Sequence, residues 1–325
     1  MKRILILATV AFFAGATSCT DGGEAVLPPP VPETTVRLEG AIGSSTRAVI
    51  GSGYEKDLEV SFARSDETAV SAETYGAWSL CEAVRSGGTG NRAILFTETQ
   101  LYPTDGRAIR FQGYYPASSA EAAGDMDAGT VTFTIDGATD IMATGCISGT
   151  TFAPLRICLF RHLLTQIQLV CYSDRADQWG EVTGIEAVGI HTRQQLVFSA
   201  EHPILNNVSS AADISNIPVQ DITDLLIPQV TEGQDIPDAQ GYILIPALSA
   251  GGTVSHPLHL QITTTKDGRG NISETVSDTY LSVDGGFLTG RRHVITLFFT
   301  EESRIKAEQV SIAPWVDQEQ GELPI

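Results

Sequence analysis

Short runs of alternating apolar and polar residues recur along most of the chain. Clear examples lie at residues 58–62, 131–135, 258–262 and 293–299, and β-branched or aromatic residues are frequent among them. A period of two with such residues is typical of half-buried β-strands. Glycine, asparagine, aspartate and proline separate the runs, and no long segment keeps the period of an amphipathic helix. The pattern predicts an all-β protein built from many short strands.

Turn signals and chain length indicate how these strands are grouped. Asp267-Gly268 lies between two alternating runs and predicts a hairpin turn. The 325 residues exceed the size of one ordinary domain, and glycine, threonine and proline cluster at residues 145–154. Many short strands with turn-rich spacers favour sandwiches. We therefore expect two β-sandwich domains, at residues 35–150 and 151–325.

The first residues have the features of an export signal. Lys2 and Arg3 precede an apolar run over residues 4–16, which is too short to span a bilayer but has the length of a signal-peptide core. Small residues then lead to Cys19, and this junction resembles a bacterial lipobox, in which the cysteine becomes the lipidated N-terminus. We expect a lipoprotein signal peptide at residues 1–18, with acyl chains such as palmitate on Cys19. The alternative is a plain secretory peptide with a coincidental cysteine.

A lipidated cysteine would tether the chain to a membrane. The linker at residues 19–34 contains a proline run, which is a stiff, extended spacer. Asp21 and Glu24 resemble the surface-export signals of Bacteroidetes lipoproteins. We therefore expect a surface-exposed protein anchored in the cell outer membrane through Cys19.

The charge balance limits the partners that the chain can have. Its 39 Asp and Glu residues outnumber the 20 Lys and Arg residues, giving a net charge of -19. Phosphate binding needs clustered Lys and Arg, so this composition argues against nucleic acid as a partner. It also argues against a polybasic membrane-binding patch.

The sequence carries none of the common catalytic or metal-binding patterns. Its six histidines form no H-E-x-x-H pair, and there is no nucleophile elbow, Walker loop or dinucleotide fingerprint. Cys158 and Cys171 lie in apolar runs, so we expect buried free thiols there. We expect a protein that is not an enzyme, with no cofactor, no catalytic residues and no metal site.

Four local patterns follow one another along the chain. They are FQGYYP at residues 111–116, TDIMA at 139–143, FRHLLTQI at 160–167, and a late set with GYILIP at 241–246, the run at 290–299 and IAPW at 312–315. Their order and spacing resemble the fimbrillin family of Bacteroidales, also called Mfa-like or FimA-like proteins. Within them, we expect His162 to be packed and hydrogen-bonded, and Asp140 to satisfy backbone donors in a tight connection.

The resemblance implies two transthyretin-like β-sandwich domains in tandem and assembly by strand exchange. In the family, the lipoprotein precursor fills its own groove with an N-terminal strand until a protease cuts after an arginine in the next loop. The candidate exchanged strand has four alternating residues, Val36, Leu38, Gly40 and Ile42. Arg47 matches the processing position, so Ala48 would begin the mature form. The alternative for Arg47 is an ordinary exposed loop residue.

The C-terminal segment is the candidate donor strand, with Val310, Ile312 and Trp315 as its residues. The tail after Trp315 is short and acidic, which departs from an apolar donor strand, so stalk, tip and anchor positions all stay open. The leading hypothesis is a structural or adhesive subunit of a cell-surface fimbria. Its partners would be other fimbrial subunits, the outer membrane and receptors on host or bacterial surfaces. The alternative is a surface-exposed glycan-binding lipoprotein, which would need exposed aromatic platforms.

Overall fold

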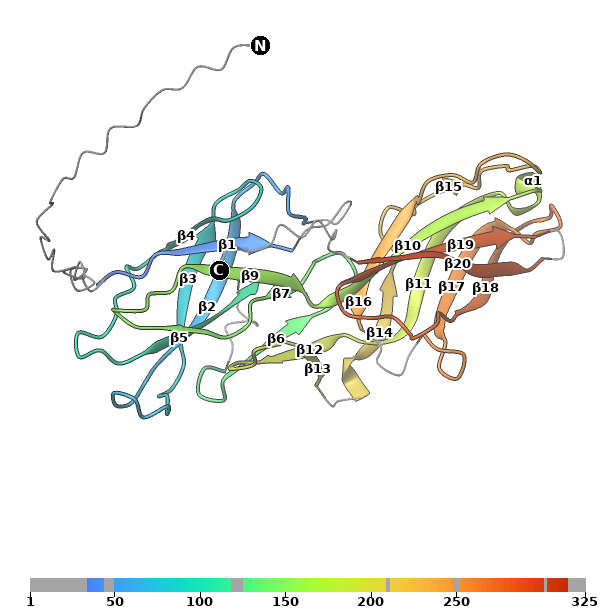
Figure 1. Ribbon diagram of the computed structural model, residues 1–325. Coiled ribbons are helices and arrows are strands. Elements are labelled where there is room, and N and C mark those ends of the chain that lie inside the picture. The colour runs from blue at the N-terminus through green and yellow to red at the C-terminus, as the bar shows by residue number, and fades with distance from the viewer. Residues whose placement is uncertain are drawn as a thin grey trace, which may run out of the picture. The chain divides into compact units, whose positions relative to one another are not determined.

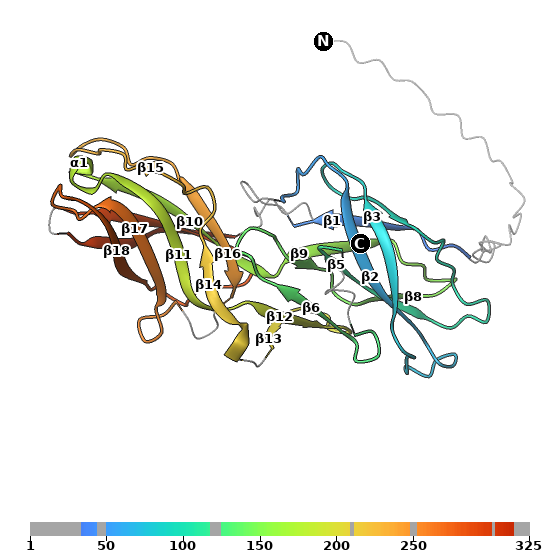
Figure 2. The same ribbon diagram turned by 180° about the vertical axis from the view of Figure 1, so that it is seen from behind.

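Strands form nearly all of the regular structure, as the alternating sequence predicts (Figures 1 and 2). The computed structural model describes residues 34–43, 50–117, 125–208, 211–247, 252–300 and 303–314, which all belong to one compact unit. Helix is limited, in these residues, to α1 (Ala176–Trp179) and a 3-10 turn at Ala211–Asp213. The all-β prediction is therefore confirmed. No helix in the described ranges has the length and apolar character needed to cross a membrane.

The N-terminal half forms one sheet that closes on itself. Its strands are β1 (Leu38–Ile42), β2 (Leu58–Asp66), β3 (Ser79–Arg85), β4 (Arg92–Phe96), β5 (Ile109–Tyr115), β7 (Met142–Ala143), β8 (Ile147–Gly149) and β9 (Ile157–His162). They pair in the order β2-β3-β4-β1-β9-β7-β5-β8, and β5 pairs with β2 as well. Strands β2, β3, β4, β1, β9, β7 and β5 thus form a ring, so β1 is one link of a closed chain of hydrogen-bonded strands.

An aromatic cluster fills the inside of this ring. Phe62 lies 6.0 Å, centroid to centroid, from both Phe111 and Phe160, with its ring nearly perpendicular to each. Phe96 packs against Phe62 and Phe111 at 5.3 and 5.6 Å. The cluster has room because Gly113 carries no side chain: an added Cβ would lie 2.7 Å from the Phe62 ring. Burial of these rings supplies much of the apolar surface that holds the N-terminal sheet together.

Three further sheets are formed by the remaining strands. The first has the order β16 (Gly241–Pro246), β10 (Leu164–Ser173), β19 (Arg291–Phe299) and β20 (Ile305–Pro314). The second has the order β14 (Ile214–Pro218), β11 (Glu181–His191), β17 (Leu258–Lys266) and β18 (Ile272–Leu281), with β15 (Leu225–Leu226) beside β11. The third has the order β13 (Leu205–Asn207), β12 (Arg193–Val197) and β6 (Thr130–Thr134). Buried apolar residues of all three sheets belong to one core.

The hairpin predicted at Asp267-Gly268 joins β17 to β18, whose pairing begins at Lys266 and Ile272. One carboxylate oxygen of Asp267 accepts hydrogen bonds from the backbone N–H groups of Arg269 and Asn271. Gly268 has a φ of 77°, a left-handed conformation that glycine adopts without strain. The local sequence therefore fixes this turn.

Two of the sequence patterns meet inside the protein. Nδ1 of His162, at the end of β9, lies 2.6 Å from Oδ2 of Asp140, and both side chains are fully buried. His162 is thus packed and hydrogen-bonded, as expected. The hydrogen bond of Asp140 runs to this imidazole, whereas the sequence suggested backbone donors.

All four cysteines in the described ranges are free thiols, and Cys158 and Cys171 are buried as expected. Burial raises the pKa of each of these two thiols to about 12. They are therefore unreactive while the fold is intact, because the thiolate is the nucleophile.

Candidate functional site

The candidate exchanged strand is β1, which lies between β4 and β9 (Figure 1). It runs antiparallel to β4 and parallel to β9. The four alternating residues of the candidate strand are all buried. Val36, two residues before β1, and Leu38 and Ile42 within it are 3–6% exposed, and Gly40 lies between the last two. These residues join the core of the N-terminal ring, so removal of β1 would open both the ring and its core.

Backbone hydrogen bonds hold β1 and the residues at its two ends. The N–H of Val36 donates to the carbonyl of Gln100 at 2.9 Å. On the other edge, the N–H groups of Glu39 and Gly43 donate to the carbonyls of Arg156 and Phe160, at 2.8 and 2.9 Å. Bonds of this kind do not depend on the side chains of the strand, so another extended strand can form them in the same place. We call the position that β1 occupies between β4 and β9 the β1 lane.

Arg85 reaches β1 through a buried hydrogen bond: its Nε donates to the carbonyl of Gly40 at 2.9 Å. The other guanidinium nitrogens donate to the carbonyls of Ser86, Gly88 and Gly90 in the loop after β3. The side chain is fully buried, and this burial, together with the Arg92 charge, lowers its pKa. A buried cation is costly unless all its donors are satisfied, so the fold needs a carbonyl from β1 at this point.

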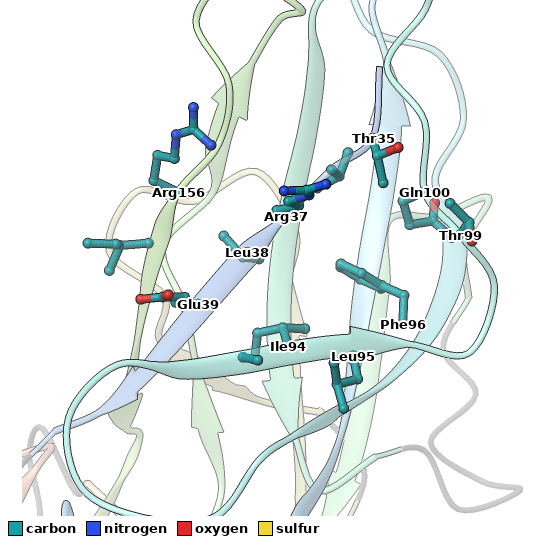
Figure 3. Close-up of a pocket in the computed structure, with 13 residues that line it drawn as sticks. Thr35, Arg37, Leu38, Glu39, Ile94, Leu95, Phe96, Thr99, Gln100 and Arg156 are labelled. Carbon is teal, nitrogen blue, oxygen red and sulfur yellow. The ribbon is translucent and has the colours of Figure 1, made fainter. Parts of the chain in front are cut away.

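A groove opens beside the N-terminal part of β1, where the chain after β4 turns away from it (Figure 3). Its volume is about 640 Å³. Leu38, Ile94 and Phe96 form its apolar part, and the exposed Arg37 and Arg156 lie at its rim. Main-chain pairing of β1 with β4 covers only three residue pairs. β1 is therefore paired over fewer residues with β4 than with β9, where the pairing covers four residue pairs.

The other predicted site residues are far less defined by the structure. Cys19, Arg47, Ala48 and Trp315 lie outside the described residues. Val310 and Ile312 lie in β20, the edge strand of its sheet, which pairs along its length with β19. The register shifts there, so Val310 has no opposite residue in β19.

Sequence reasoning missed Arg85, because a single arginine at the end of an alternating run looks like any exposed residue. The signal that was present is the glycine-rich loop that follows it, S-G-G-T-G-N at residues 86–91. Gly88 and Gly90 have positive φ angles, which turn their carbonyls toward the guanidinium.

The described tryptophans do not form the aromatic platform that a glycan-binding site would need. Trp179 is 1% exposed, and its Nε1 donates to the carbonyl of Thr300. Trp78 is half-buried, with the Arg110 guanidinium 4.2 Å above its ring and Phe198 beside it. In the described ranges, no group of three or more His, Cys, Asp or Glu side chains is placed to hold a metal ion.

The sequence matches the fimbrillin-like family over residues 46–315. The chain belongs to the fimbrillin-like family. The match begins after β1 and ends at the residue that follows β20.

Solved structures share the fold of this fimbrillin-like chain. One is a "putative cell adhesion protein" from Bacteroides uniformis, with a TM-score of 0.57, 14% identity, and coverage of 87% of this chain and 98% of that one. Another, from Bacteroides ovatus, has a TM-score of 0.57 at 12% identity, and the alignment covers 89% of this chain and 100% of that one. A third, from Parabacteroides distasonis, has a TM-score of 0.54 at 10% identity, and the alignment covers 90% of this chain and 100% of that one. No curated protein matches the sequence.

Proposed function

We propose that this fimbrillin-like protein is a structural or adhesive subunit of a cell-surface fimbria, assembled by strand exchange at the β1 lane. The observation that carries the proposal is that β1 completes a ring of strands and that backbone hydrogen bonds hold it there. A strand that its neighbours hold through the backbone can be replaced by one from another subunit.

The proposal includes the events before assembly. Signal peptidase would leave Cys19 as an acylated N-terminus in the outer membrane. Cleavage after Arg47 would then free β1 and leave Ala48 as the new N-terminus. Arg47 lies between β1 and Ile50, the next described residue, so a cut there separates β1 from the rest of the chain.

We further propose two transthyretin-like sandwiches in tandem, with the change between them after β9. Residue 150 is a less suitable boundary, because β9 (Ile157–His162) pairs with β1 and β7 in the N-terminal ring. As the edge strand of its sheet, β20 is the candidate donor strand to a neighbouring subunit of a different kind.

The test uses the native thiols as reporters of β1. Cys158 lies opposite Gly40 in the parallel pairing of β1 and β9 and is 3% exposed. Residues 44–49 are replaced by a site for a specific protease, and thiol labelling is followed by mass spectrometry before and after cleavage. We expect cleavage followed by dilution to speed labelling of Cys158 about tenfold or more, because β1 can then leave.

Cys171 is the internal control, since it is fully buried in β10 and should label at an unchanged rate. Added β1 peptide should restore the protection of Cys158. The proposal is wrong if Cys158 stays protected after cleavage and dilution while released β1 is absent from the solution.

A further inference from the structure

The β1 lane has one position that leaves no room for a side chain. A Cβ added to Gly40 would lie 2.8 Å from Cδ1 of Ile94 and 3.3 Å from Cε2 of Phe160. Ile94 and Phe160 come from the strands on either side and are 5% and 1% exposed, so neither can swing into solvent. An occupant with a larger residue here must displace core side chains.

Arg85 fixes the backbone at the same residue. Its Nε needs a carbonyl, and a strand shifted by one residue would place the next residue's backbone groups on the opposite edge. A shift of two residues restores a carbonyl but moves the glycine away from Ile94 and Phe160. The two features together therefore admit a single register.

We propose that the β1 lane selects its occupant through a glycine, and takes a strand of the pattern apolar-x-apolar-x-Gly-x-apolar from a different fimbrial subunit. This inference rests on the proposed strand exchange. The pattern is that of Val36, Leu38, Gly40 and Ile42, which the lane already holds.

The strand β20 of a second copy does not meet this requirement. If β20 runs in the direction of β1 with Val310 and Ile312 facing inward, three registers are possible. They place Pro314, Ile312 or Val310 at the position of Gly40. In the opposite direction the residue there is Glu308, Val310 or Ile312. All of these are larger than glycine, so copies of this chain do not polymerise with one another through β20.

The last residues of a second copy fit no better in the direction of β1. They contain Gly321, but with this residue at the glycine position, Asp317 and Glu319 would take the inward places of Val36 and Leu38. Two carboxylates would then enter the apolar core. In the opposite direction, with Gly321 at the same position, the apolar residues after it fit, but Glu319 would enter the core at the buried place of Ile42. The preferred occupant is therefore a strand of another protein.

The experiment is a peptide competition on the chain cleaved within residues 44–49, with β1 removed by dilution. Five peptides are compared: a copy of residues 34–43, the same with Gly40→Leu, a copy of residues 308–317, the same with Pro314→Gly, and a copy of residues 315–325. We expect the β1 copy to bind and Gly40→Leu to weaken it about tenfold or more. The copy of residues 308–317 should bind weakly and gain about tenfold from Pro314→Gly.

A second arm uses the uncleaved chain and does not depend on exchange. Gly40→Leu should speed labelling of Cys158 about tenfold, with Gly40→Ala between it and the wild type. The matched control is Gly184→Leu, since a Cβ added to Gly184 in β11 meets open space.

The outcomes separate this inference from the proposed function. Selection through a glycine is wrong if the Gly40→Leu peptide binds as tightly as the β1 copy. It is also wrong if the peptide of residues 308–317 or that of residues 315–325 binds as tightly as the β1 copy. If no peptide binds, strand exchange itself is wrong, and the labelling comparison still decides whether the glycine fixes the register. Equal labelling of Gly40→Leu and Gly184→Leu would overturn that claim.

Discussion

At the scale of single residues, the buried pair of Asp140 and His162 joins two segments that the sequence separates by about twenty residues. We expect Asp140→Ala to lower the free energy of unfolding by about 3 kcal/mol, because it removes the acceptor 2.6 Å from Nδ1 inside a fully buried site. Urea unfolding measures the change. The control is Asp127→Ala at an exposed position, which should stay within about 0.5 kcal/mol of the wild type. A comparable loss in both variants would show that the pair does not stabilise the fold.

His293 gives the protein a defined dependence on pH. Its ring is fully buried against Phe287, and neither ring nitrogen has a hydrogen-bond partner among the described residues. Burial, assisted by the charge of Arg291, lowers the pKa of His293 from 6.5 to about 4. As the pH falls, the unfolded chain therefore takes up a proton on His293 near pH 6.5, whereas the folded chain takes it up only near pH 4.

Stability is thus lost as the pH falls from 6.5 toward 4, and this one site accounts for about 3 kcal/mol of the loss, at ~1.4 kcal/mol per pKa unit. We expect His293→Leu to reduce the difference in unfolding free energy between pH 7 and pH 4.5, measured by urea unfolding at both values. His202→Leu, at an exposed position, should leave that difference unchanged. An equal pH dependence in the wild type and His293→Leu would rule out this role.

The inward residues of β1 were predictable, because alternation alone assigns Val36, Leu38 and Ile42 to one face. The role of Arg85 was not, since its partners are backbone carbonyls, and the glycine-rich loop whose glycines supply two of them has the composition of any tight turn. The pairing of Asp140 with His162 was also missed, although both stood out in the sequence, because nothing in the chain reports which distant groups meet.

At the scale of elements, β1 is held by its inward side chains as well as by its backbone. We expect Leu38→Ala to destabilise the uncleaved chain by about 2–4 kcal/mol, because Leu38 is 3% exposed in the core of the ring. Leu95→Ala is the matched control: Leu95 lines the same groove but is 59% exposed, so its loss should cost about 0.5 kcal/mol or less. The measurement is urea unfolding, with the labelling rate of Cys158 as a local reporter. Similar effects of both substitutions would show that β1 contributes little core packing.

Element prediction from the sequence succeeded where contacts are local and failed where they are distant. The β17–β18 hairpin follows from Asp267-Gly268 and two alternating runs. Closure of the N-terminal ring does not, since β1 pairs with β9 across more than a hundred residues and β2 pairs with β5 around β3 and β4. The sandwich boundary expected at residue 150 stays a prediction, because turn residues mark turns within a sheet as well as between sheets.

At the scale of the whole molecule, the net charge of -19 opposes the compact state by self-repulsion. We expect the urea midpoint at pH 7 to rise when sodium chloride is raised from about 20 to about 300 mM. The added salt shortens the screening length from roughly 20 Å to roughly 6 Å and so weakens the repulsion between the acidic side chains. Near the isoelectric point of 4.6 the same salt change should have little effect, since the net charge is then close to zero. A salt dependence of equal size at both pH values would mean that the net charge is not its cause.

The central claim is that β1 leaves this fimbrillin-like chain when the chain is assembled. The most direct test is N-terminal sequencing and intact mass of the protein recovered from fimbriae on its native cell surface. The account predicts a form that begins at Ala48 and lacks β1. Assembled protein that begins at an acylated Cys19, with β1 still attached, would contradict it.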